Sequence, residues 1–459
     1  MIPPAPAVRS HRRRRLSLPR SSFLPRPLVT LFASLPLVLA ATAPSVAAPQ
    51  CADLSKGWCV ARRFSGDIPQ GELGFRFGEP LDSDGDDRAD VAAGARFKLK
   101  DNLLQNGVAT VWSGATGEKI REWDGVLRNG LFGHSVVPIP DLDGDRLADV
   151  VISAPNSNPD GTLRGVVSAR SPKSGELIWR KIADREENLG WDLALAGDQN
   201  GDQTVDVFAG APAGDQGHVY LLNGKDGSVL RTYAAAGVSS SFGWYVAKTD
   251  DLDADGHADL VVGAFQEEEP DGCGVYLLSA ASGALLHRWS TPDRLTGFGE
   301  VVAAIGDLDG DGHGEIAVAS PRTSDDTRSL PGEVQIFSGS DWKELRHWTG
   351  KQPGELYGRM VYSADDVDGD GVDDVAIGAP WYRSGEADKT GRAELRSGKT
   401  GEVLAEWLGD EADCWFGWHI RRAPDPDGKG RPALLISSLR HPVDGKRGVG
   451  VLDLYVLKR

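Results

Sequence analysis

Hydrophobic and polar residues follow one arrangement that returns seven times along the chain, at intervals of about 57 residues. Each repeat opens with a hydrophobic residue and a glycine, near positions 73, 132, 189, 242, 298, 357 and 416. An apolar run such as DVAIGAP, an alternating run such as GHVYLLNG and a last run ending in an aromatic residue follow, with turn residues between them. Runs of this length between turn signals are typical of short strands, so each repeat predicts four of them.

Four-stranded units at this period are typical of propeller blades. A single blade cannot bury both of its faces, whereas stacked neighbours bury them together. The pattern therefore predicts an all-β fold, a seven-bladed β-propeller that forms one domain over residues 49–459.

The two ends of the repeat array complement each other. Phe64, in the stretch GWCVARRF, precedes Gly74 by ten residues, as the strand-ending Trp123 precedes Gly133. The C-terminal stretch GVGVLDLYVLKR ends after a third strand. We expect the N-terminal strand to complete the last blade and close the ring, which removes exposed sheet edges.

An acidic loop of nine residues opens eight residues after each of the seven glycines. Six loops place a carboxylate or amide at positions 1, 3, 5 and 9, and position 7 offers a backbone carbonyl. The predicted metal ligands are Asp82, Asp84, Asp86, Arg88 and Asp90; Asp141, Asp143, Asp145, Leu147 and Asp149; Asp198, Asn200, Asp202, Thr204 and Asp206; Asp251, Asp253, Asp255, His257 and Asp259; Asp307, Asp309, Asp311, His313 and Glu315; and Asp366, Asp368, Asp370, Val372 and Asp374.

Oxygen ligands at alternate positions of a tight loop favour calcium, which takes six to eight of them in flexible geometry. Four carboxylates within nine residues also repel one another without a cation. The sequence predicts up to six calcium ions. The seventh loop, DPDGKGRPA at 425–433, has Lys429 at position 5 and Ala433 at position 9, so we expect no metal there and a compensating charge from Lys429.

The first 48 residues differ in kind from the repeats. They hold seven arginines, no acidic residue, an apolar run from Leu28 to Ala43 and a small-residue stretch, PSVAA. This order is typical of a secretory signal segment, so we expect a secreted or extracytoplasmic protein with no membrane span after its removal. The formal charge then falls from −17 to −24 on loss of the seven arginines, which disfavours nucleic acid as a partner. Cys51 and Cys59 are placed to form a small disulfide loop, and the sequence leaves open whether they do.

With its F-G openings, acidic loops and G-A-P endings (Gly210–Pro212 and Gly378–Pro380), the chain resembles FG-GAP repeat proteins, as in the β-propeller head of integrin α subunits. The resemblance covers about residues 60–459. It implies calcium on one face of the propeller and partner binding on the other.

The residues that follow the opening glycines are expected at the mouth of the central channel, away from the acidic loops. They are Phe75, His134, Trp191, Trp244, Glu300, Arg359 and Trp418. Aromatic rings suit sugar faces and peptide anchors, so Trp191, Trp244 and Trp418 are candidate ligand-binding residues. Packing between blades is the alternative for the same residues.

These features favour a non-enzymatic binding or adhesion module for a protein or glycan partner. A carbohydrate-active propeller, either a lectin or a polysaccharide lyase, is the first alternative, and a structural envelope protein is the second. A lyase needs a base and a cation beside the uronate, and the sequence offers only His134, His419 and Arg359 for those roles.

Overall fold

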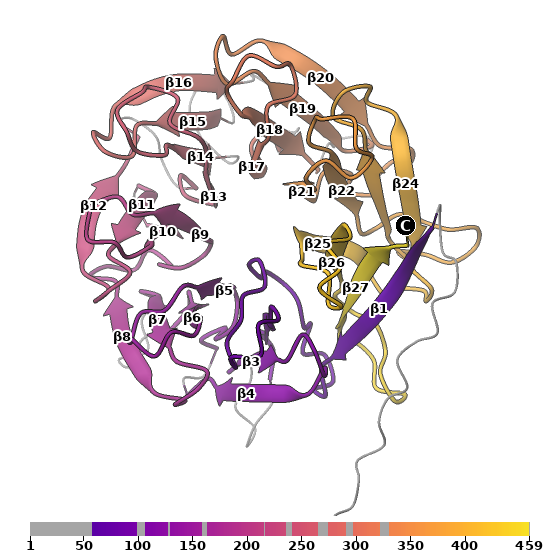
Figure 1. Cartoon of the computed structure of the whole chain (residues 1–459), viewed down its shortest axis with the longest axis horizontal. Helices are drawn as coiled ribbons and strands as arrows, with labels where there is room; N and C mark the ends of the chain where they lie inside the picture. The colour runs from indigo at the N-terminus through magenta and orange to yellow at the C-terminus, as the bar shows by residue number, and fades with distance from the viewer. Residues whose placement is uncertain are drawn as a thin grey trace, which may run out of the picture. The chain divides into compact units, whose positions relative to one another are not determined.

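The computed structural model describes residues 57–98, 106–126, 129–157, 163–214, 216–235, 241–264, 274–290, 297–321 and 330–458. The expected secretory segment and Cys51 lie outside these ranges. Strands are the regular elements of the described chain, and they form seven antiparallel sheets arranged around a central axis (Figure 1). The prediction of an all-β, seven-bladed propeller is confirmed.

The blades follow one another in chain order. Their strands are β2 (Val91–Ala95), β3 (Val108–Trp112) and β4 (Lys119–Asp124); β5 (Val136–Ile139), β6 (Asp149–Ala154), β7 (Val166–Arg170) and β8 (Leu177–Ile182); β9 (Leu193–Gly197), β10 (Asp206–Ala211), β11 (His218–Leu222) and β12 (Val229–Tyr233); β13 (Tyr245–Lys248), β14 (Leu260–Ala264), β15 (Gly274–Leu278) and β16 (Leu285–Ser290); β17 (Val301–Ile305), β18 (Glu315–Ser320), β19 (Glu333–Phe337) and β20 (Glu344–Thr349); β21 (Met360–Ser363), β22 (Val375–Ala379), β23 (Arg392–Arg396) and β24 (Val403–Leu408); and β25 (Phe416–Arg422), β26 (Ala433–Ser438) and β27 (Val451–Leu457).

The inner edge of the first blade is irregular. Its sheet has three strands, and the segment before β2 joins it through isolated bridges from Leu73 to Ala95 and from Leu81 to Asp90. Pro80 lies within that segment and has no backbone N–H to donate to a ladder. The segment therefore takes the place of an inner strand without forming a continuous one.

The ring closes through the N-terminal strand, as the sequence predicts. Strand β1 (Trp58–Ser65) pairs antiparallel with β27 and completes the order β1-β27-β26-β25 in the seventh blade. Arg63 reinforces this junction because its Nε lies 2.6 Å from Oδ1 of Asp453, a carboxylate that is 2% exposed. Cys59, in the same strand, is disulfide-bonded.

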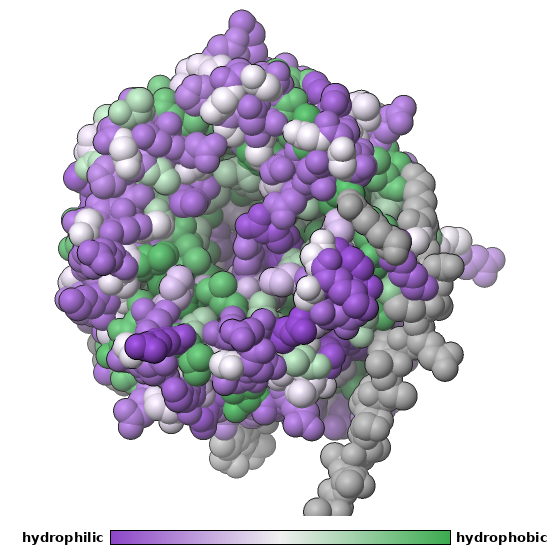
Figure 2. All heavy atoms as spheres, viewed as in Figure 1, coloured by the Kyte–Doolittle hydropathy of each residue, from purple (hydrophilic) through white to green (hydrophobic). Residues whose placement is uncertain are grey.

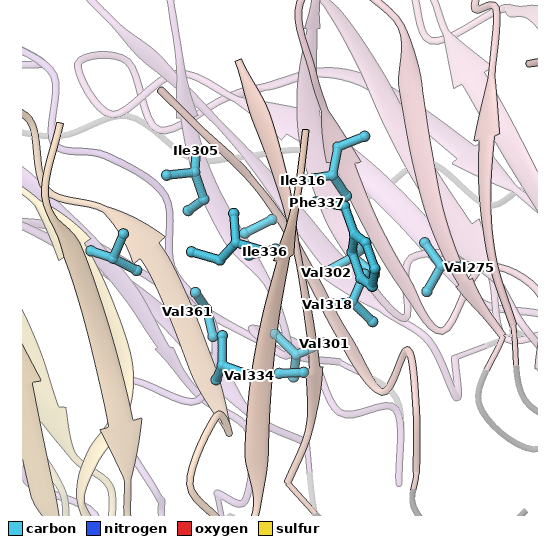
Figure 3. Close-up of a cluster of buried hydrophobic side chains, with 14 of the residues drawn as sticks. Val275, Val301, Val302, Ile305, Ile316, Val318, Val334, Ile336, Phe337 and Val361 are labelled. Atoms are coloured by element: carbon cyan, nitrogen blue, oxygen red, sulfur yellow. The ribbon is translucent and has the colours of Figure 1, made fainter. Parts of the chain in front are cut away.

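Neighbouring blades pack through aliphatic side chains. In the cluster of Figure 3, Val301, Ile316 and Ile336 of the fifth blade face residues of both adjacent blades, among them Val275 of β15 and Val361 of β21. Buried strands of this kind read as continuous apolar runs, which explains sequences such as EIAVAS in β18.

Glycine is required at the repeated positions for two physical reasons. Each opening glycine has a positive φ, from 79° at Gly299 to 92° at Gly243, which a residue with a side chain rarely adopts. It also packs against the end of the second strand of the preceding blade, where a Cβ on Gly94 would lie 1.9 Å from the carbonyl oxygen of Gly133. The F-G and G-A-P motifs are thus the two sides of a blade junction.

Candidate functional site

The acidic loops are shaped by their own first carboxylate. In the second loop, Gly144 N donates to Oδ1 of Asp141 at 2.7 Å and Arg146 N donates to Oδ2 at 2.7 Å. The first loop repeats this arrangement, with Gly85 N 2.7 Å and Asp87 N 3.0 Å from the carboxylate of Asp82. The position 1 side chain therefore curls the loop backbone around itself, as Asp does in turns.

This curl brings the carboxylates of five loops together. In each of these loops three ligand atoms lie within 4.8 Å of one another. The triads are Asp82, Asp84 and Asp86; Asp141, Asp143 and Asp149; Asp251, Asp253 and Asp255; Asp307, Asp309 and Asp311; and Asp366, Asp368 and Asp374. Three hard oxygen donors at this spacing fit a calcium ion. Asn200 stands at position 3 of the remaining predicted site, the third loop at 198–206, where its Nδ2 donates to Oδ2 of Asp202 at 3.1 Å.

The position 9 carboxylates have a second role that the sequence did not reveal. Asp90 is 1% exposed and accepts two backbone N–H groups, from Ser83 in its own loop at 2.8 Å and from Gly114 in the turn between β3 and β4 at 2.9 Å. Equivalent bonds join Asp374 to Val367 and Gly398. This residue therefore ties the acidic loop to the outer turn of its blade.

Burial also raises the pKa of these position 9 side chains. The pKa of Asp90, Asp149 and Glu315 rises to about 7, and that of Asp259 and Asp374 rises to about 6. The charged form loses hydration in each case, and the neighbouring loop carboxylates add repulsion. A divalent cation beside the loop offsets both effects, so the electrostatics of the loops suit calcium.

The seventh loop, which is predicted to hold no metal, has a cationic side chain beside its carboxylates. The guanidinium of Arg431, at position 7, bonds to the carboxylates of Asp425 and Asp427, whereas Lys429 reaches only Asp427, at 3.4 Å. The expectation that Lys429 compensates this loop is thus only partly right. The role of Arg431 at position 7 was not predicted from the sequence, and its backbone N also donates to Oδ2 of Asp425 at 3.2 Å.

Six of the seven residues that follow the opening glycines contact one another in a continuous series, which consists of five rings and the guanidinium of Arg359. Ring centroids lie 4.7 Å apart for Trp191 and Trp244, 4.9 Å for His134 and Trp191, 4.7 Å for Phe75 and His134, and 5.6 Å for Phe75 and Trp418, while the guanidinium of Arg359 lies 4.2 Å from the Trp418 ring. We call these six residues the mouth ring. Part of the mouth ring serves to pack the blades together, because Phe75, Trp418 and Arg359 are all less than 8% exposed.

Two further tryptophans continue the mouth ring outward. Trp415 stacks on Trp418 with centroids 5.4 Å apart and an interplanar angle of 22°, and Trp381 lies 5.8 Å from Trp415. Both outer rings are half-buried. The exposed aromatic surface therefore lies over the sixth and seventh blades, together with the half-buried Trp191 and Trp244.

The histidines considered for catalysis are enclosed. His134 is fully buried within the mouth ring, and His419 is 2% exposed with Nε2 3.0 Å from the carbonyl oxygen of Phe77. Burial and the nearby arginines hold the pKa of both imidazoles well below the usual value. Both imidazoles are therefore buried, with His134 among the rings at the channel mouth and His419 in the wall of the central channel.

Comparisons with known proteins agree with this geometry. An FG-GAP repeat model matches residues 132–168 and 362–393. The chain is 33% identical to integrin alpha-5 of Xenopus laevis over 215 residues, 42% of this chain and 20% of that protein. It is 31% identical to integrin alpha-8 of Gallus gallus over 274 residues, 52% of this chain and 26% of that protein. The chain thus spans about a fifth to a quarter of the length of these relatives.

A solved structure supports the fold alone. The crystal structure of BBS1N in complex with ARL6DN, soaked with lead, superposes with a TM-score of 0.52 and 9% identity, covering 88% of this chain and 97% of that one. Seven blades around one axis, with acidic loops in the repeats, define the class as a β-propeller. The chain contains FG-GAP repeats, and its propeller resembles the head of integrin α subunits. No helix among the described residues is long and apolar enough to cross a membrane.

Proposed function

We propose that this protein is an exported, calcium-binding β-propeller that acts as a non-enzymatic binding module for an extracellular protein or a glycan. The observation that carries the proposal is the repeated triad of carboxylates, which recurs at the same place in five blades with ligand atoms within 4.8 Å. Similarity to integrin α subunits supports the same class of function.

Calcium has a structural role in this proposal. Each loop connects the inner edge of a blade to its second strand, and in five of the six loops the position 9 residue accepts a hydrogen bond from the outer turn. A cation that binds only the folded loops stabilises the ring by linkage. The loops that would hold it are 82–90, 141–149, 198–206, 251–259, 307–315 and 366–374.

The proposed partner surface is the exposed aromatic area at the opposite end of the channel. It comprises the half-buried rings of Trp191, Trp244, Trp381 and Trp415, with Trp418 beneath Trp415. Aromatic surfaces with adjacent cations, such as Lys389 over Trp381 at 4.4 Å, suit sugar rings or aromatic and acidic peptide anchors. The enclosure of His134 and His419 favours binding over lyase chemistry.

The test is retention of the mature protein on immobilised glycans and on extracellular-matrix proteins, in calcium and in chelator. Binding that needs calcium and is lost in Trp415→Ala supports the proposal. A matched control is Trp342→Ala, because Trp342 lies at an outer turn against His287 and Trp289, away from the mouth ring. Binding to no partner, or equal binding by both variants, contradicts the proposed surface.

A further inference from the structure

The centre of the ring contains a cavity of about 400 Å³ that all seven blades line. Figure 2 shows a hollow at this position, with hydrophobic walls and hydrophilic side chains around it. Small side chains of three inner strands, Ala194, Ala247 and Ala303, line this space and help to keep it open. Its volume lies within the range of small-molecule sites.

One end of the cavity is closed by contacts that cross the channel. Arg76, fully enclosed, pairs with Asp192 of the third blade and lies 4.5 Å from the ring of Tyr245 in the fourth. The Tyr245 hydroxyl donates to the sulfur of Met360 in the sixth blade at 3.3 Å. The mouth ring lies beyond this layer, one residue earlier in each inner strand.

The other end of the cavity opens on the face of the acidic loops. Its rim consists of residues at the ends of inner strands, just before those loops. Of these, Lys248 is exposed, and the side chains of Glu79 and Arg422 are 38% and 44% exposed. Arg422 is already paired, since it contacts both Glu79 and Asp365.

Two cations at the cavity have no carboxylate partner within the part of the chain that the structure describes. The Arg421 guanidinium lies 4.5 Å from the ring of Tyr362, and its polar contacts are the carbonyl oxygen of Ile420 at 2.9 Å and the sulfur of Met360 at 3.7 Å. Lys248 at the rim forms no ion pair there either. A guanidinium held against a tyrosine over an apolar cavity is pre-organised to bind an anion.

The charges around the cavity also differ from those of the whole protein. Its lining holds four cations, Arg76, Lys248, Arg421 and Arg422, and two acids, Glu79 and Asp192, so it carries two excess positive charges in a chain of −17. The remaining wall is apolar, with Val137, Val302 and Val361. One unpaired guanidinium can bind one carboxylate through two hydrogen bonds. The apolar wall suits a ligand whose remaining part is uncharged.

We propose that this central cavity is a binding site for a small molecule bearing one carboxylate, which Arg421 receives in a bidentate ion pair and Lys248 attracts at the entrance. The site is separate from the aromatic surface, which lies at the other end of the channel. It is also separate from the acidic loops, since none of the predicted metal ligands lines the cavity.

Isothermal titration of the full-length mature protein tests this, with benzoate, hexanoate and galacturonate as probes and the corresponding primary amide of each as the uncharged control. We expect a dissociation constant of about 1 mM or tighter for at least one acid and binding at least about tenfold weaker for its amide. A preference for galacturonate assigns the site to sugar acids, and a preference for the other two assigns it to simple organic acids. Absence of binding by all three acids, or equal binding of acid and amide, overturns the proposal.

Variants locate the site. Arg421→Gln should weaken acid binding at least about tenfold, Arg421→Lys should lie between it and the wild type, and Arg383→Gln, which removes the same charge from an exposed pair with Asp388, should bind as the wild type does. Ala247→Leu fills the cavity without a change in charge and should also abolish binding, which keeps the test valid if Arg421→Gln does not fold. Unchanged affinity in the folded variants contradicts the site.

Discussion

Arg431 and Asp425 form a bidentate ion pair in the seventh loop: Nε donates to Oδ2 at 2.8 Å and Nη2 donates to Oδ1 at 2.7 Å, and the Asp425 side chain is 1% exposed. The blade whose loop is predicted to hold no metal thus carries its own cation at the place where the other loops gather carboxylates. Because this charge comes from the chain itself, we expect the seventh loop to keep its shape whatever the calcium concentration.

Arg431→Ala should therefore destabilise the protein in chelator. The substitution leaves a buried carboxylate without its partner, and we expect a loss of about 1.5–3 kcal/mol in the free energy of unfolding, measured by urea denaturation. Lys429→Ala is the matched control, because Lys429 is 68% exposed and should contribute less than about 1 kcal/mol. Equal losses in the two variants would contradict the assignment.

The same pair predicts a pH dependence. The hydrogen bonds from Arg431 lower the pKa of Asp425 below its usual range. Because the folded value lies below the unfolded one, the stabilisation is complete above the unfolded value of about 4 and disappears as pH falls through the folded value. The difference in stability between wild type and Arg431→Ala should shrink as pH falls below 4, and a difference that grows there would refute this account.

Calcium should raise the melting temperature of the mature protein. A site filled at a free concentration one hundred times its Kd adds about 2.7 kcal/mol, and several sites add together. Asp143→Asn should remove the contribution of one loop, whereas Asp388→Asn, an exposed acid outside the loops, should not. A melting temperature that is the same in calcium and in chelator would contradict the proposal of calcium binding.

Ring closure depends on a side chain near the N-terminus. Arg63 joins β1 to β27 through two hydrogen bonds to Asp453, at 2.6 and 2.8 Å. We expect Arg63→Ala to cost about 2 kcal/mol in unfolding free energy, since it leaves a nearly buried carboxylate unpaired. Arg383→Ala removes an ion pair that is exposed on both sides and should change stability by less than about 1 kcal/mol; a similar cost for both arginines would contradict a special role for the β1–β27 junction.

Truncation of the inner Trp418 and of the outer Trp415 should affect stability and partner binding differently. Trp418 is 7% exposed, so Trp418→Ala should cost about 3–5 kcal/mol through the cavity that it leaves. Trp415 is half-buried, and Trp415→Ala should lower the melting temperature far less while reducing retention on the partner. Thermal melts followed by the retention assay separate the two effects. Loss of stability without loss of retention in Trp415→Ala would show that Trp415 serves packing and would contradict its role in partner binding.

Local sequence determined much of this protein. The count of blades, the closing N-terminal strand, the acidic loops and the unusual seventh loop all follow from spacing within one repeat, because a hairpin, a tight loop and a strand period depend on residues close together in the chain. Gly133, for example, is recognisable as a repeat opening from its neighbours alone. Its packing against Gly94, 39 positions away, is visible only in the structure.

Tertiary structure decided what depends on several blades at once. Arg76 contacts Asp192 and Tyr245 across the channel, and Arg421 contacts Tyr362 of a neighbouring blade. The cavity between them is lined by the inner edges of all seven blades. The buried position of Asp90 beneath the turn at Gly114 has the same origin. Such contacts depend on how the blades tilt and close around the axis. That geometry is set by packing between distant residues, which the period of a repeat does not encode.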